Sequence, residues 1–257
     1  MKVLDSMVSY QALRASLTPP MTLGFVPTMG ALHLGHAALL SQSVAECDVT
    51  VLSIYLNPTQ FDNEGDLQKY PETLNADLEM AKNLGVDIVL LPDYMQIYPD
   101  DFKYLIAETE LSNQLCGAHR RGHFTGVLTI VMKLLNIVKP QRAYFGQKDF
   151  QQYLLIRDMV KAFFLDVEII SCPTVRENDG LALSSRNVNL SEDSRHLAPE
   201  LHDALISNGT DEEISIRLTK IGFQVDYIET RGERRFGAAL IDGVRLIDNV
   251  SIDEVAQ

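Results

Sequence analysis

The sequence predicts an α/β fold, in which a parallel sheet with helices on both faces is followed by a smaller α+β lobe. Short apolar runs typical of buried strands alternate with amphipathic helical segments over the first two thirds of the chain. Such alternation is typical of a parallel sheet that is covered on both faces. Beyond residue 172 the alternation ends and the chain becomes more charged. We therefore expect one domain over residues 1–172 and a small lobe over residues 173–257.

The expected elements follow in chain order. Apolar runs predict strands at residues 21–26, 49–56, 86–91, 142–145 and 167–171. Apolar residues at helical spacing predict helices at residues 37–47, 74–84, 124–138 and 150–163. The third of these helices is apolar nearly all round, which indicates that it is buried. In the lobe we expect a helix near residues 191–207 and short strands near residues 224–229 and 238–246.

Composition excludes some classes of function. The chain has 257 residues and a formal net charge of −13, whereas proteins that bind nucleic acids or anionic membranes broadly are basic. A local basic pocket for phosphate remains compatible with this charge. No apolar run reaches the length of a membrane span, and the N-terminus lacks the apolar core of a signal peptide. We expect a cytoplasmic protein with no nucleic-acid or membrane partner.

The most informative stretch is His33-Leu34-Gly35-His36, between a predicted strand and a predicted helix. Two imidazoles three residues apart lie on one side of a first helical turn, where unpaired backbone N–H groups favour an anion. Gly30 and Gly35 allow the backbone to approach a ligand closely. The stretch therefore predicts a polyphosphate site. Packing histidines and a zinc site are the alternatives, although no nearby Cys or His completes a set of zinc ligands.

A second polar segment, residues 145–152, also lies between a strand and a helix. Lys148 is a point charge suited to phosphate, and Gly146 permits close approach of the backbone. Asp149 and Gln152 have the spacing of a helix capping box. That structural role is an alternative to a role in ligand binding.

Three further stretches carry polar side chains in positions suited to ligand binding. Ser184, Ser185 and Arg186 form a run of hydroxyls and a guanidinium that can wrap a polyphosphate and stabilise a leaving pyrophosphate. Gln60 follows a predicted strand, so its amide can point into a cleft at the end of the sheet. The segment from Arg120 to Phe124 opens the buried helix, which makes it another natural anion site. Each stretch taken alone also fits ordinary loop chemistry.

Taken together, these motifs resemble the pantothenate synthetase (pantoate–β-alanine ligase) family of the HxGH nucleotidyltransferase superfamily. The resemblance rests on the ten residues from Pro27 to His36, on residues 145–152 and on the serine–serine–arginine run, which is similar to the KMSKS loop of class I synthetases. The resemblance extends over most of residues 21–189 and is found again at residues 222–229 and 245–249. It implies a Rossmann-like first domain and a C-terminal lobe that covers the active site.

The resemblance implies an AMP-forming carbon–nitrogen ligase of the coenzyme A pathway. Such an enzyme condenses (R)-pantoate with β-alanine to give pantothenate through a pantoyl adenylate, and it releases AMP and pyrophosphate. ATP is then a substrate, Mg²⁺ accompanies it, and a homodimer is expected. Two alternatives stay open: a nucleotidyltransferase of the same superfamily that acts on another small substrate, and a nucleotide-binding protein that has lost catalysis.

The same resemblance implies roles for individual residues. His33 and His36 contact the phosphates, with His36 as the proton donor, while Lys148 and Arg186 bind the leaving group. Further ATP contacts are expected from Met29, Gly30, Gly35, Gly146, Asp149, Val175, Leu183, Ser184 and Ser185. Gln60 and Gln152 orient pantoate, and the substrate pocket also includes Asn57, Tyr70, Arg120 and His123. Asp77 is a candidate Mg²⁺ ligand, with an exposed helical aspartate as the alternative.

The chain departs from the family pattern at three places. Gln147 stands where the family has Glu, which removes a carboxylate beside Lys148. Arg121 stands where Pro is expected. The lobe between residues 201 and 222 looks shorter than the family's by a helix or more. Because the family's lobe covers the active site, the resemblance does not establish how this site is closed.

Overall fold

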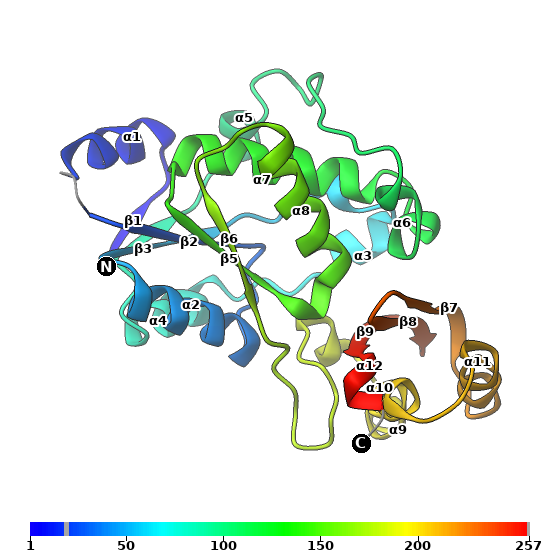
Figure 1. The fold of residues 1–257 in the computed structure, drawn as a ribbon. Helices are drawn as coiled ribbons and strands as arrows, with labels where there is room; N and C mark the ends of the chain where they lie inside the picture. The colour runs from blue at the N-terminus through cyan, green and yellow to red at the C-terminus, as the bar shows by residue number, and fades with distance from the viewer. Residues whose placement is uncertain (18–20, 256–257) are drawn as a thin grey trace.

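The computed structural model describes residues 1–17 and 21–255. Its first part is a parallel sheet with helices on both faces, and its second part is a lobe built on a small antiparallel sheet (Figure 1). Both parts of the predicted fold class are confirmed. Within the described ranges, no helix combines the length and apolar character needed to cross a bilayer.

The large sheet has six parallel strands in the order β1-β4-β3-β2-β5-β6. The strands are β1 (Lys2–Leu4), β2 (Leu23–Thr28), β3 (Val49–Ile54), β4 (Ile88–Leu90), β5 (Arg142–Gly146) and β6 (Glu168–Cys172). All five predicted strands are present. Strand β1 was missed because three residues are too few to show an alternation of apolar and polar side chains.

Helices cover both faces of this sheet (Figure 1). The helices of this part of the chain are α1 (Met7–Ser16), α2 (Leu34–Glu46), α3 (Glu64–Gln68), α4 (Leu74–Asn83), α5 (Tyr94–Ile97), α6 (Cys116–His119), α7 (His123–Val138) and α8 (Phe150–Ala162). Alternate residues of β2 and β3 serve the two faces: Phe25 and Val51 pack with α7 and α8, whereas Val26 and Leu52 pack with α2 and α4. This arrangement explains why the strands read as continuous apolar runs.

The order of strands reverses between β2 and β5. The chain moves from β2 to β3 and β4 on one side, and β5 and β6 lie on the other. At such a reversal the loops that follow the two central strands diverge and leave a crevice beyond their carboxyl ends. The histidine stretch follows β2 and the Lys148 segment follows β5, so both open into that crevice.

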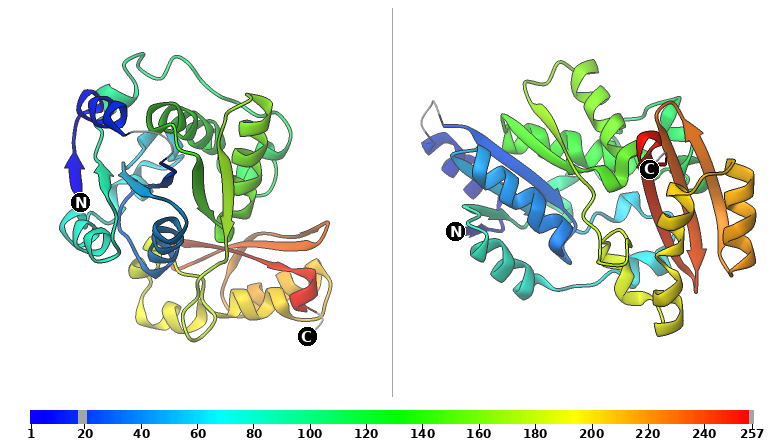
Figure 2. Two further views of the ribbon diagram at one scale, coloured as in Figure 1. Left: turned by 60° about the vertical axis from the view of Figure 1, so that its left-hand side comes forward. Right: turned by 60° about the horizontal axis from the view of Figure 1, so that its bottom comes forward.

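The C-terminal lobe packs against the carboxyl ends of the large sheet (Figure 2). Its antiparallel sheet consists of β7 (Gln224–Arg231), β8 (Arg234–Ile241) and β9 (Val244–Ser251). Its helices are α9 (Glu192–Leu197), α10 (Glu200–Ile206), α11 (Asp211–Lys220) and α12 (Ile252–Val255). An apolar core of its own, with Leu201, Leu205 and Leu218 at the centre, holds the lobe together.

Two predictions for this lobe were wrong in detail. The helix expected over residues 191–207 is two helices, because Pro199 has no N–H to continue α9 and instead begins α10. The strand expected over residues 238–246 is a hairpin, in which Asp242 and Gly243 turn the chain with φ of 53° and 74°. Helix α11 was also missed, although Thr210 and Glu213 form a capping box at its start.

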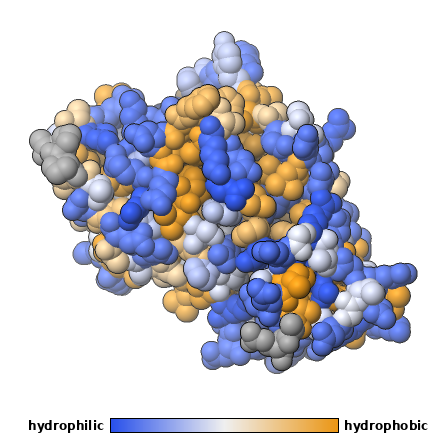
Figure 3. All heavy atoms as spheres, in the orientation of Figure 1, coloured by the Kyte–Doolittle hydropathy of each residue, from blue (hydrophilic) through white to orange (hydrophobic). Residues whose placement is uncertain are grey.

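Strand β6 forms one edge of the large sheet and has no neighbouring strand on its outer side within the described ranges. Apolar side chains gather on this face over β6 (Figure 3). Phe163 and Phe164, between α8 and β6, are both exposed, the latter to 93%. This edge is therefore an apolar surface on the described part of the chain.

Candidate active site

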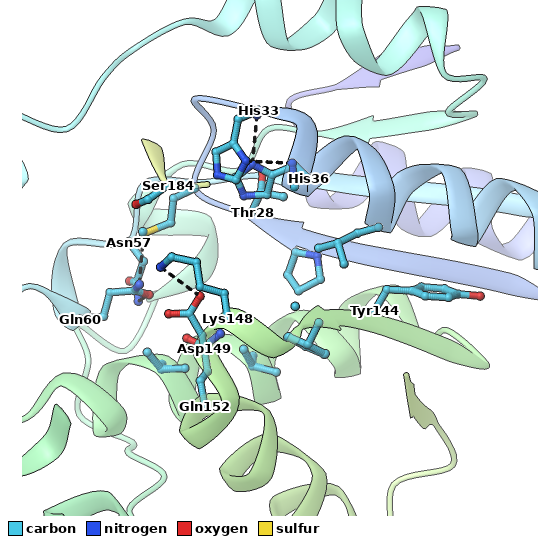
Figure 4. Close-up of a pocket in the computed structure, with 18 of the residues that line it drawn as sticks. Thr28, His33, His36, Asn57, Gln60, Tyr144, Lys148, Asp149, Gln152 and Ser184 are labelled. Carbon is cyan, nitrogen blue, oxygen red and sulfur yellow. Dashed lines mark hydrogen bonds and ion pairs between the residues drawn. The ribbon is translucent and has the colours of Figure 1, made fainter. Parts of the chain in front are cut away.

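A cavity lies at the carboxyl ends of β2 and β5, under the C-terminal lobe. Of the twenty residues that the sequence singled out, all but Gly30, Asp77 and Ser185 line it. The cavity has two polar walls that face each other. His33 and His36 lie on one wall, and Lys148, Asp149 and Gln152 lie on the other (Figure 4). Residues far apart in the sequence thus meet where the strand order predicts a ligand site.

Helix α2 begins three residues before its predicted start, because the histidines themselves cap it. The Nδ1 atom of His33 accepts a hydrogen bond from the N–H of Gly35 at 3.1 Å, and Nδ1 of His36 accepts one from the N–H of His33 at 3.3 Å. A neutral imidazole that accepts through Nδ1 carries its proton on Nε2. The two rings, with centroids 4.1 Å apart, are therefore Nε2–H donors.

These imidazoles are neutral in the free protein. Burial lowers the pKa of His33 to about 4, with a smaller effect from the charge of Lys148. Burial also lowers the pKa of His36 to about 3, and His33 adds to the effect. Both rings are therefore hydrogen-bond donors that are uncharged at neutral pH.

Asp77 supports the loop between β2 and α2. Its carboxylate is 2% exposed and accepts hydrogen bonds from the N–H groups of Ala31 (2.9 Å) and Leu32 (2.8 Å) and from the hydroxyl of Thr73 (3.0 Å). Ala31 has φ of 49°, a conformation that costs a residue with a Cβ about 1–2 kcal/mol. The aspartate therefore stabilises a strained turn.

This geometry does not fit the predicted role of Asp77 in Mg²⁺ binding. A metal ligand needs a free oxygen lone pair directed at an accessible site, whereas both oxygens of Asp77 are occupied behind the loop. The alternative of an exposed helical aspartate was wrong, since the side chain is buried. The anchoring of this loop by Asp77 could not be predicted from the sequence, because its backbone partners lie 45 and 46 residues away.

The Lys148 segment follows β5 as a short 3-10 turn over Gln147–Asp149. The Lys148 Nζ atom lies 4.0 Å from a carboxylate oxygen of Asp149, and both side chains point toward the imidazoles across the cavity (Figure 4). Asp149 occupies the cap position of α8 without a side-chain hydrogen bond to that helix. The capping box considered for Asp149 and Gln152 is therefore not formed, and both side chains are available to a ligand.

Gln60 is held in place from behind. The buried Asn57 donates its amide N–H to Oε1 of Gln60 at 3.0 Å, and its own Oδ1 accepts from Tyr98 and Thr59 at 2.9 and 3.0 Å. The Gln60 amide nitrogen lies 3.1 Å from the sulfur of Met29, which is a weak acceptor. Asn57 thus orients the amide of Gln60, which lines the cavity.

His123 fixes the backbone of the same loop. Its Nδ1 lies 2.8 Å from the carbonyl oxygen of Gln60, and its Nε2 lies 3.1 Å from Nη1 of Arg120. Because arginine can only donate, Nε2 is the acceptor and Nδ1 carries the proton. Burial, followed by the charge of Arg120, lowers the pKa of His123 to about 4. Arg121, the departure from the family pattern, is exposed.

The loop from residue 175 to 186 closes one side of the cavity. The Leu183 N–H donates to the Val175 carbonyl at 3.0 Å, and Ser184 caps the following turn. The Ser185 hydroxyl donates to the carbonyl of Ala31 at 3.0 Å, which ties this loop to the histidine stretch. Ser185 is therefore a structural link here, although the sequence suggested a ligand contact.

Arg186 is engaged by Asp66 of α3. Its Nε and Nη2 atoms lie 3.1 and 2.8 Å from the two carboxylate oxygens, and its guanidinium lies 5.6 Å from the Tyr70 ring centroid. Burial opposes ionisation of Asp66, but the hydrogen bond and charge of Arg186 outweigh burial and lower the pKa of that carboxyl. A phosphate that binds Arg186 must therefore compete with Asp66.

The sequence missed the apolar floor of the cavity. One face of α7 supplies it, through Val127, Ile130, Val131 and Leu134. The sequence showed that this helix is apolar on nearly every side, which hides the face that meets a ligand. Only the polar residues just before the helix signalled its position near the site.

Comparisons with known proteins match this geometry. The sequence profile of pantoate-beta-alanine ligase matches residues 2–251. The pantothenate synthetase of Bdellovibrio bacteriovorus is 51% identical over 251 residues, which cover 98% of this chain and 99% of that protein. The enzyme of that name from Legionella pneumophila (strain Corby) is 49% identical over 249 residues, or 97% of this chain and 99% of that protein.

Solved structures agree with the sequence comparisons. A crystal structure of the pantoate-beta-alanine ligase from Francisella tularensis, complexed with beta-gamma ATP and beta-alanine, has a TM-score of 0.95 and 41% identity over 98% of both chains. The pantothenate synthetase from Thermus thermophilus has a TM-score of 0.90 and 37% identity, over 98% of this chain and 99% of that one. Because the match spans nearly the whole of these proteins, they share the short C-terminal lobe.

Proposed function

Since the chain belongs to the pantoate-beta-alanine ligase family, it is an ATP-dependent ligase that joins pantoate to β-alanine, and we propose that the reaction passes through a pantoyl adenylate. In the first step the pantoate carboxylate attacks the α-phosphorus of ATP, and pyrophosphate leaves. In the second step the β-alanine amine attacks the acyl carbon, loses a proton and displaces AMP. The observation that supports this route is the pair of facing walls, with imidazole donors opposite Lys148.

The two walls suit a triphosphate. In our proposal the Nε2–H groups of His33 and His36 donate to phosphate oxygens, and Lys148 neutralises charge from the other side. Donors fixed in advance where charge accumulates stabilise the transition state, and one such donor contributes about 2.7–4 kcal/mol. Bound phosphate also favours protonation of His36, which makes proton donation from this residue compatible with its low pKa in the free protein.

Pantoate fits the adjoining part of the cavity. The molecule has hydroxyls, a carboxylate and two methyl groups on one carbon. We assign its polar groups to Gln60 and Gln152 and its methyl groups to the apolar face of α7. Neutral amides satisfy hydroxyls without adding charge beside the triphosphate, and a substrate held in this way reacts as if intramolecularly.

Magnesium enters our proposal as an ion carried by the nucleotide. Mg²⁺ commonly retains several waters and binds through substrate phosphates with few protein carboxylates. Asp77 does not fit as its ligand, and we assign no other residue to it.

Assembly and location remain proposals. We propose a homodimer that forms along β6, because a free strand edge with exposed phenylalanines beside it is suited to pairing with a second copy. Sedimentation velocity of the wild-type protein and of Phe164→Asp tests this arrangement, and a wild-type monomer would contradict it. The cytoplasmic location expected from the sequence stays a prediction.

Pyrophosphate–ATP exchange is the direct test of the adenylate. Purified protein is incubated with Mg²⁺, ATP, labelled pyrophosphate and D-pantoate, without β-alanine. We expect label in ATP only when pantoate is present, because only a reversible adenylate returns label to ATP. Pantothenate formation from all three substrates without any exchange would contradict the adenylate and leave the ligase intact.

A further inference from the structure

The C-terminal lobe contacts the Lys148 segment through a buried side chain, Asn249 of β9. Its amide nitrogen donates to the carbonyl oxygens of Gln147 and Lys148, both at 2.9 Å. The residue is only 4% exposed. One neutral amide thus spans two consecutive peptide groups of the segment that presents Lys148 to the cavity.

The orientation of this amide is fixed by its neighbours. Its Oδ1 atom accepts a hydrogen bond from Arg234, and the guanidinium of that arginine lies 4.1 Å from the Phe150 ring centroid, at the start of α8. Because arginine can only donate and carbonyls can only accept, the oxygen must face Arg234 and the nitrogen must face the Lys148 segment. No other assignment of the amide satisfies all partners.

The preceding residue holds a second segment of the site. Asp248 binds Arg176 through both carboxylate oxygens, at 2.6 and 2.9 Å, and Arg176 also donates to the carbonyl of Gly180. Burial opposes ionisation of Asp248, but His202 and Arg176 outweigh it and lower the pKa of the carboxyl. Asp248 also accepts the backbone N–H of Asn249 at 2.8 Å, which joins the two contacts into one network.

We propose that Asn249 is a positioning residue that sets Lys148 for the triphosphate from the C-terminal lobe. The inference rests on the proposed function and extends it, because it gives the short lobe a part in the first chemical step. The side chain of Asn249 acts through the backbone of Gln147 and Lys148 and does not touch the substrate.

Two substitutions separate positioning from bulk stability. Asn249→Asp keeps the shape of the side chain but places oxygens against two carbonyl oxygens, so the Lys148 segment must shift. We expect the rate of pantoate-dependent exchange at saturating ATP to fall by about tenfold to a hundredfold, the effect of a displacement of roughly 1 Å. Asn249→Ala, which removes the donors without repulsion, should lose less. The KM for pantoate, which depends on Gln60 and Gln152, should stay within about twofold of the wild type.

Arg235→Lys is the matched control. Arg235 is a buried residue of the same small sheet, and it donates to the carbonyls of Leu205, Ser207 and Gly209, all within the lobe. This variant should lower the melting temperature while keeping the exchange rate below that temperature. If Asn249→Asp lost activity only in proportion to its melting temperature, as the control does, the positioning role would be wrong.

Calorimetric titration with ATP provides a readout that does not depend on the adenylate. We expect Asn249→Asp to bind ATP several-fold more weakly than the wild type, because Lys148 is displaced from the phosphates. Unchanged ATP affinity together with an unchanged exchange rate would overturn the inference. Absence of exchange in the wild type would instead contradict the adenylate, while the comparison of ATP affinities would still decide the role of Asn249.

Discussion

The two walls of the active site differ in the charge of the side chain that anchors each of them. The loop that presents His33 and His36 is held by the carboxylate of Asp77, from the same domain. The segment that presents Lys148 is held by the neutral amide of Asn249, from the other lobe. A carboxylate therefore anchors the wall with the neutral imidazole donors, and a neutral amide anchors the wall with the cationic lysine.

The difference shows how each wall keeps its function. A carboxylate suits the histidine loop because it can accept several N–H groups of a strained turn at once. An amide suits the Lys148 segment because it binds carbonyls without adding a negative charge that would weaken attraction between Lys148 and phosphate. The carboxylate that anchors the first wall comes from the same domain, with a further hydrogen bond from Ser185, whereas the anchor of the second wall comes from the C-terminal lobe.

Removal of the donors should have the largest effect. Lys148→Ala and His36→Ala should each lower the rate of pantothenate formation by about a hundredfold to a thousandfold, as loss of one fixed transition-state donor does. The folded structure should persist, because Lys148 joins no other elements and the hydrogen bond that His36 accepts lies within the first turn of α2. Steady-state kinetics and thermal melting measure the two quantities. Lys161→Ala, an exposed lysine of α8, is the control, and near-wild-type turnover in either active-site variant would contradict its assigned role.

The anchor of the first wall should matter for both stability and activity. Asp77→Ala leaves the N–H groups of Ala31 and Leu32 without acceptors, at about 1–3 kcal/mol for each buried group. We therefore expect the free energy of unfolding, measured with urea, to fall by about 2–4 kcal/mol, and exchange activity to fall with the loss of the turn. A variant of normal stability that needs more Mg²⁺ would instead support the metal-ligand hypothesis.

The charge states of the three histidines around the cavity can be tested through pH. The pKa values of His33 and His123 are about 4 and that of His36 about 3, all below the ordinary value of 6.5. The unfolded chain therefore binds more protons than the folded chain below pH 6.5, and the free energy of unfolding should decrease as the pH falls from 6.5 toward 4. Above this window these rings should contribute no pH dependence.

One buried ring should contribute on the order of 2 kcal/mol between pH 7 and pH 5. His123→Gln keeps a donor for the Gln60 carbonyl and should flatten the curve by about that amount. Urea unfolding at several pH values measures it. An equal slope in the wild type and the variant would mean that His123 is charged in the folded protein, which would contradict the hydrogen-bond assignment.

The sequence was sufficient where chemistry is carried by residues that are close along the chain. Five of the six strands of the large sheet follow from apolar runs, and many of the polar residues that line the cavity follow from short motifs at the ends of β2 and β5. The Asp-Gly turn between β8 and β9 was also readable, since that dipeptide favours a hairpin, but the apolar residues around it suggested one strand.

The anchors could not be predicted from the sequence for a physical reason. Asp77 meets the histidine loop across 45 and 46 residues, and Asn249 meets the Lys148 segment across 101 and 102. Nothing local marks such a side chain, because its role depends on how the whole chain packs. The neutrality of the imidazoles is hidden for the same reason, since it comes from burial.

The smallest expected effect concerns Arg186, which belongs to neither wall. Its partner Asp66 is partly exposed, and an ion pair of that kind contributes about 0.2–1 kcal/mol. Asp66→Asn should release Arg186 for phosphate and lower the KM for ATP by up to about fivefold. Glu64→Gln removes the same charge from the same helix without breaking an observed ion pair, so it serves as the control in steady-state assays. A higher KM for ATP in Asp66→Asn alone would mean that Asp66 positions Arg186 for the nucleotide, as Asn249 does for Lys148. Asp66 would then be a third anchor of the site, and its proposed competition with phosphate would be wrong.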